Sequence, residues 1–130
     1  MTSKDIPEPS EAVLAKKTRH LRAPIEIRIE ITLGRQSFTA TSRNLALGGV
    51  SFETLESLNE GDKVNILLYI PVNKELELLK ASSTIKWVKD MNGSLMVGAG
   101  FDAFAPGDEK RHREWMLECV RAQKMGNFYI

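Results

Sequence analysis

Apolar and polar residues alternate along much of the chain between about residues 25 and 104, which is the period of strands with one buried face. The clearest run follows Pro24, where isoleucine occupies every second position from Ile25 to Ile31. Turn signals punctuate the pattern, among them a tight turn over 59–62 and the hairpin dipeptide Asn92-Gly93. The pattern predicts six strands, within the ranges 25–31, 36–43, 50–53, 64–72, 76–88 and 94–104.

The period changes after Pro106-Gly107. Trp115, Met116, Cys119 and Val120 recur at the spacing of one helix face. This predicts one amphipathic helix from residue 108 to about 123. Its apolar stripe is expected to face the core, and a dimer or partner surface is the alternative.

Six short strands in one domain need a way to protect their edges, and closure into an antiparallel barrel provides it. The predicted fold class is therefore all-β with a terminal helix: a six-stranded antiparallel barrel followed by a C-terminal α-helix. We expect a flexible arm over 1–15, the barrel and helix over 16–125, and a tail over 126–130. Phe52, Trp87 and Phe101 are predicted to be core or barrel-closing residues.

Composition narrows the class of function. The 130 residues fit one domain, and 18 basic against 17 acidic residues give a net charge of +1. This balance does not favour a general nucleic-acid binder, and no run approaches the roughly 20 apolar residues of a membrane span. The single cysteine cannot form an internal disulfide, so a cytoplasmic location without membrane insertion is expected.

Two segments are candidates for a binding site. The first is the basic stretch from Lys16 to Arg22, ahead of the isoleucine run, and a solvated linker is the alternative interpretation. The second is the segment from Asn44 to Gly49, in which Asn44 can donate and accept hydrogen bonds and two glycines allow close backbone approach. The alternative for the second segment is a plain hairpin connection whose glycines have positive φ.

In their order and spacing these segments resemble the PilZ family, whose members bind cyclic di-GMP. The resemblance runs from about Lys16 to the C-terminal helix and implies a barrel that receives a signal. Arginine suits this dianionic ligand because its planar donors bind phosphates and guanine edges and its face stacks on bases. The residues that the resemblance assigns to the ligand are Lys17, Arg19, Arg22, Asn44, Gly48 and Gly49.

Two positions depart from the family pattern. If Arg22 is the second arginine of the first motif, Thr18 occupies the place of the first, and Ala46 occupies the serine position of the second motif. Two hypotheses therefore stay open. The domain is a receptor that relays cyclic di-GMP to an effector protein by ordering its basic N-terminal segment, or it is an adaptor that no longer binds the ligand.

Enzymatic chemistry is not predicted, because the sequence holds no recognisable nucleophile–base pair or phosphate-binding glycine loop. His20 and His112 lack metal-ligand spacing, so no metal or cofactor is expected. Cys119 reads as a packed thiol. The expected partners are cyclic di-GMP and an unidentified effector protein, with the domain a monomer or homodimer. The resemblance implies regulation of motility or exopolysaccharide secretion as the output.

Overall fold

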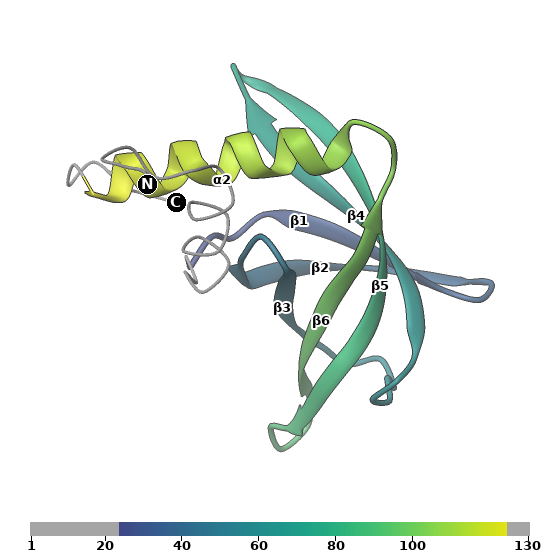
Figure 1. Ribbon diagram of the computed structural model, residues 1–130. Helices are drawn as coiled ribbons and strands as arrows, with labels where there is room; N and C mark the ends of the chain where they lie inside the picture. Colours follow the sequence, from purple (N-terminus) through teal and green to yellow (C-terminus); the bar gives the residue numbers. More distant parts are fainter. Residues whose placement is uncertain (1–23, 125–130) are drawn as a thin grey trace, which may run out of the picture.

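The computed structural model describes residues 24–124, and within that range the chain forms six strands and one helix (Figure 1). In chain order the elements are β1 (Arg28–Leu33), β2 (Gln36–Leu45), β3 (Gly49–Thr54), β4 (Lys63–Val72), β5 (Glu75–Asp90), β6 (Leu95–Phe104) and α2 (Asp108–Lys124). Every strand overlaps one of the six predicted ranges, with bounds that differ by up to a few residues, and the terminal helix is confirmed. The predicted arm over 1–15 and tail over 126–130 lie outside the described residues.

The six strands close into a single antiparallel barrel in the order β1–β2–β3–β6–β5–β4. Closure comes from β1, which pairs with β2 on one side and β4 on the other, so that Ile31 faces both Phe38 and Ile66. Each described strand therefore has two hydrogen-bonded neighbours, which removes the exposed edges that an open sheet would leave. The predicted fold class is confirmed.

The isoleucine run lines the barrel interior. All four isoleucines of 25–31 are buried, whereas Glu26 and Arg28 are exposed. The strand itself begins only at Arg28, three residues later than the alternation predicts. The difference arises because the backbone N–H of Ile27 donates to the side-chain hydroxyl of Ser42 at 2.9 Å and not to a backbone carbonyl of β2.

The aromatic core is mostly as predicted. Phe52 is fully buried at 0% exposure, and half-buried Phe101 packs against the core. The rings of Phe101 and Phe104 meet edge to face, with centroids 5.2 Å apart. Trp87, in contrast, is one of the exposed large hydrophobic residues.

Helix α2 crosses one end of the barrel and adds Met116 and Cys119 to the core (Figure 1). Its first residue, Asp108, accepts hydrogen bonds from the backbone N–H of Lys80 at 2.9 Å and from the Arg111 guanidinium at 2.7 Å. Burial opposes ionisation of Asp108, but these two donors outweigh it and lower its pKa. The carboxylate thus fixes the start of the helix to β5. The predicted core-facing stripe is confirmed for Trp115, Met116 and Cys119.

Candidate functional site

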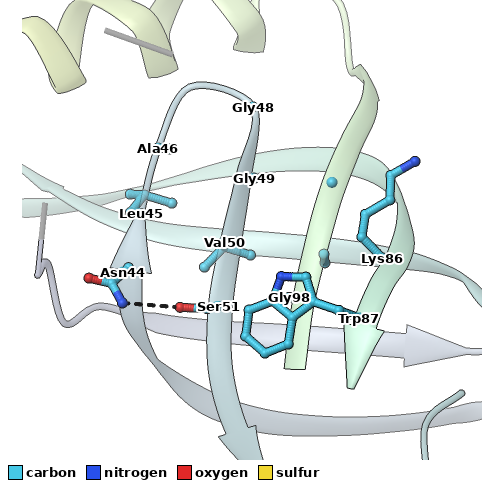
Figure 2. A pocket seen from close by; sticks show the side chains of 12 residues that line it. Asn44, Leu45, Ala46, Gly48, Gly49, Val50, Ser51, Lys86, Trp87 and Gly98 are labelled. Atoms are coloured by element: carbon cyan, nitrogen blue, oxygen red, sulfur yellow. Dashed lines mark hydrogen bonds between the residues drawn. The ribbon is translucent and has the colours of Figure 1, made fainter. Parts of the chain in front are cut away.

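A β-bulge in β2 turns Asn44 toward the outside of the barrel. Ser42 pairs with Phe52 and Asn44 pairs with Ser51, so Arg43 is an extra residue in the ladder. Ser42 is buried, and strict alternation would point Asn44 inward as well. Because of the bulge, Asn44 instead stands on the outer surface beside Ser51, with its Nδ2 3.4 Å from the Ser51 Oγ (Figure 2).

A second bulge, in β5, does the same for Trp87. Ile85 pairs with Ala99 and Trp87 pairs with Gly98, which leaves Lys86 as the extra residue. Ile85 points into the core, so strict alternation would bury Trp87 too. The Trp87 side chain is instead 37% exposed on the outer face, beside Lys86. The prediction that Trp87 is a core or barrel-closing residue is therefore wrong.

The two bulges border one cleft of about 310 Å³ on the outer surface, between the β2–β3 turn and strands β5 and β6 (Figure 2). Asn44, Gly48 and Gly49, three of the predicted ligand residues, all line it. Lys86 and Trp87 form its opposite side. The structure thus brings the second predicted motif together with two residues that lie about forty positions further along the chain.

The glycines of this cleft are needed for close packing. The segment does form the predicted hairpin connection between β2 and β3, but neither Gly48 nor Gly49 has a positive φ, so the prediction of left-handed turn glycines is wrong. A Cβ at Gly49 would overlap the carbonyl oxygen of Ala99 on the neighbouring strand. A Cβ at Gly98 would overlap the indole of Trp87, which shows that the ring lies directly on Gly98. The absence of a side chain at Gly49 therefore lets β3 approach β6 closely, and its absence at Gly98 leaves room for the Trp87 indole.

The β2–β3 turn, which forms the end of the cleft, is held from two directions. The backbone N–H of Ala46 donates to the Gly49 carbonyl across the turn, and the N–H of Phe101 in β6 donates to the Gly48 carbonyl, both at 2.9 Å. The Ala46 carbonyl lies 2.9 Å from Nε2 of His112 in α2. The turn is therefore tied both to the sheet and to the helix.

His112 is a feature that sequence reasoning missed. Its side chain is 1% exposed, and its ring packs against Phe101 and Phe104 at centroid distances of 5.6 and 5.3 Å. Burial lowers its pKa to about 4, against the smaller opposing effect of the Ala46 carbonyl. His112 is therefore neutral at pH 7. The signal that could have found it is its place on the apolar stripe, because Trp115, Met116 and Cys119 follow it at three, four and seven positions.

The segment that leads into β1 is anchored next to the β2 bulge. Ser42 accepts the N–H of Ile27 through its hydroxyl, donates that hydroxyl to the Ile25 carbonyl, and donates its own N–H to the Ile27 carbonyl at 2.9 Å. Ser42 is two residues from Asn44. The chain that follows the basic stretch is thus fixed close to the motif at the cleft.

The basic residues predicted to bind the ligand, Lys17, Arg19 and Arg22, lie outside the described residues. Lys86 and Trp87 were missed as candidate site residues. Their signal was the apolar pair Ile85 and Val88, separated by three positions instead of an even number, which in a strand indicates a bulge.

Across residues 24–124, no group of three or more His, Cys, Asp or Glu side chains is placed to hold a metal ion. In the same part of the chain, no helix is both long and apolar enough to cross a membrane. Lys86 is the only charged side chain among the residues described as lining the cleft.

These features define a class of protein: a small closed barrel with a terminal helix and a shallow outer cleft built from glycines, an amide, an indole and an ammonium group. The chain belongs to the PilZ domain family, whose model matches residues 16–118. This match begins in the basic stretch and ends in α2, and it confirms the resemblance inferred from the two motifs. No curated protein sequence matches the chain.

Solved structures show the same fold at low sequence identity. The inhibitor of motility MotI/DgrA from Bacillus subtilis superposes with a TM-score of 0.68 at 14% identity over 79% of this chain and 49% of that one. MrkH of K. pneumonia in its apo state gives 0.61 at 14% identity over 82% and 51%. A tetrameric PilZ domain from Xanthomonas campestris gives 0.53 at 15% identity over 68% and 48%. The chain spans about half the length of each of these proteins.

Proposed function

We propose that this domain is a receptor for cyclic di-GMP and that the ligand occupies the cleft beside Asn44. The observation that carries the proposal is that two separate bulges aim Asn44 and Trp87 into one outer cleft, where Gly48 and Gly49 also lie. A cleft of about 310 Å³ is at the lower end of small-molecule sites. It suits one guanine base, with the rest of the ligand covered by the basic N-terminal segment.

Trp87 supplies the stacking surface. Its indole lies over Gly98, a residue with no side chain to push the ring away from the sheet, and it is 37% exposed. Stacking of a nucleic-acid base on an aromatic ring contributes about 1–3 kcal/mol. The ring is thus positioned to receive a guanine before the ligand arrives.

The polar edge of the base would be bound by Asn44 and Ser51. An asparagine amide offers both donors and an acceptor, which matches the mixed donor and acceptor edge of guanine. The hydrogen bond that joins Asn44 to Ser51 is long, at 3.4 Å. Exchanging it for a bond to the ligand therefore costs little.

Positive charge would come from Lys86 and from the basic stretch. Lys86 lies on the cleft, and the ligand carries two phosphates. Arg22 precedes Ile25 by three residues, a length that spans at most about 10 Å when extended. Because Ile25 is bound to Ser42 beside the motif, the chain length would allow Arg22 to reach a ligand in the cleft. Binding would order the basic segment and present a new surface to an effector protein.

The adaptor hypothesis rests on Ala46 and Thr18. Ala46 lines the cleft with a methyl group in place of the family hydroxyl, and both its backbone N–H and its carbonyl are already bonded. A neutral hydrogen bond contributes only about 0.5–1.5 kcal/mol. The loss at Ala46 is no larger than the stacking contribution of Trp87, which favours the receptor. The charged contact missing at Thr18, about 1.5–3 kcal/mol, would have to come from Lys86, Lys17 or Arg19.

Isothermal titration of the full chain with cyclic di-GMP tests the proposal. Arg22→Ala and Trp87→Ala remove the proposed charge and stacking contacts, and Lys89→Ala, exposed on β5 outside the cleft, is the matched control. We expect the wild type and Lys89→Ala to bind alike. Loss of a charged bidentate contact or a stacking surface should weaken binding about ten- to a hundredfold. Absence of heat with the wild type at high micromolar ligand would favour the adaptor instead.

A further inference from the structure

The β2–β3 turn separates two clefts. One is the proposed ligand cleft, and the other, of about 590 Å³, lies between the turn and α2 and is lined in part by Leu47, Phe101, Phe104 and His112. Gly48 lines both. In Figure 2 the turn carrying Ala46 and Gly48 rises from the sheet toward the helix. A shift of this turn would therefore alter the ligand cleft and the helix contact together.

His112 forms a hydrogen bond from the helix to this turn. A carbonyl oxygen can only accept, so the 2.9 Å contact with Ala46 requires the proton of the neutral imidazole to be on Nε2. The other ring nitrogen, Nδ1, is buried and has no hydrogen-bond partner among the described residues. The ring is held by its packing on two phenylalanines, so a single geometry presents the Nε2–H to the turn.

We propose that His112 is a positioning residue for the ligand cleft, and that it couples occupation of the cleft to the docking of α2. This inference rests on the proposed function, because it assigns His112 a role at the same site. Ala46 occupies the serine position of the ligand motif. Its carbonyl oxygen is already bonded to His112 of the helix and does not serve the ligand. The helix thereby fixes the backbone next to Asn44, Gly48 and Gly49.

The other hydrogen bonds described for α2 tie it to a different part of the barrel. Asp108 and Arg111 bond to β5, and the indole N–H of Trp115 donates to the Pro71 carbonyl of β4 at 3.2 Å. None of these three contacts touches the turn. His112 therefore connects the cleft to the helix, while the others hold the helix on the barrel. By thermodynamic linkage, a ligand that stabilises this turn geometry also stabilises the docked helix. Docking of the helix in turn raises the affinity for that ligand.

Two variants separate positioning from packing. His112→Gln keeps an N–H donor at about the reach of the imidazole Nε2, whereas His112→Leu keeps a similar volume without a donor. We expect His112→Leu to bind cyclic di-GMP about two- to tenfold more weakly than the wild type, as one hydrogen bond predicts, and His112→Gln to lose less than about twofold. If His112 only stabilised the fold, both variants would lose affinity for cyclic di-GMP in proportion to their loss in melting temperature.

Amide hydrogen exchange supplies a readout that does not depend on affinity. The Ala46 amide should exchange faster in His112→Leu than in the wild type or His112→Gln, with or without ligand. Saturating ligand should slow exchange along α2 in the wild type and fail to do so in His112→Leu. Equal affinity of the wild type and His112→Leu, or equal losses in both variants, would overturn the inference. If the wild type takes up no cyclic di-GMP, the proposed function fails, and unchanged Ala46 exchange in His112→Leu would then overturn the positioning role separately.

Discussion

Acidification should destabilise this domain through one residue, His112, before most carboxylates titrate. Its pKa is 6.5 in an unfolded chain and about 4 in the folded protein, because burial disfavours the imidazolium. Between these values the unfolded state binds a proton that the folded state does not. The free energy of unfolding must therefore fall as the pH drops from 6.5 toward 4. Above pH 6.5 the stabilisation linked to the neutral His112 is complete.

The size of the effect follows from the same two values. Each pKa unit corresponds to about 1.4 kcal/mol, so the shift from 6.5 to about 4 removes roughly 3 kcal/mol on acidification. That is a large share of the roughly 5–15 kcal/mol that stabilises a typical domain. Asp108 contributes in a lower window, because its depressed pKa gives stability that is lost only below its ordinary value of 3.8.

Urea unfolding at half-unit intervals from pH 7.5 to 4 would measure the effect in the wild type, His112→Gln and a matched control, Lys110→Gln, at an exposed position of the same helix. Asp102, Glu109 and Arg113 line the same cleft as His112 and are present in all three proteins, so the comparison isolates His112. We expect the wild type and Lys110→Gln to lose roughly 3 kcal/mol in parallel, and His112→Gln to lack that part of the slope. A slope in His112→Gln as steep as in the wild type would refute the assignment to His112.

Three further predictions concern packing and anchoring. Gly49→Ala should lower the free energy of unfolding by about 1–3 kcal/mol, because the added Cβ meets a backbone carbonyl. Gly100→Ala, at the paired position in the ladder, should cost less because its Cβ meets only the flexible Lys86 side chain, and equal losses in thermal unfolding would contradict this. Ser42→Ala should lose about 1–3 kcal/mol by leaving the buried Ile27 N–H unpaired, and unchanged stability in urea would count against the anchor. Burial, with a smaller effect of Glu118, raises the pKa of Cys119 to about 11. A disulfide reagent at pH 8 should therefore modify the native thiol at least about a hundredfold more slowly than the same thiol in denaturant, and equal rates would show that the thiol is not buried.

Simple periodicity was sufficient to predict most of the barrel. The alternation after Pro24 placed the isoleucines inside, and the change of period after Gly107 located α2. The hairpin at Asn92-Gly93 also forms as its turn chemistry predicts, with both residues at positive φ. These features are local, because each depends on residues close together in the sequence.

The candidate site was only half predictable, because its geometry depends on breaks in that alternation. The motif drew attention to Asn44 and Gly49, but a strict strand period buries Trp87, and only the extra residue Lys86 in the β5–β6 register turns it outward. The contact between His112 and Ala46 joins residues 66 positions apart. No local pattern in the sequence encodes a contact at that separation.

The most direct test of the central claim is to follow the backbone and indole N–H signals of the isotope-labelled full chain by nuclear magnetic resonance while cyclic di-GMP is added. The account predicts saturable shifts concentrated at Asn44, Gly48, Gly49 and the indole N–H of Trp87, with Trp115 responding only through the helix. An unchanged spectrum at high micromolar ligand, or shifts confined to the opposite side of the barrel, would contradict it.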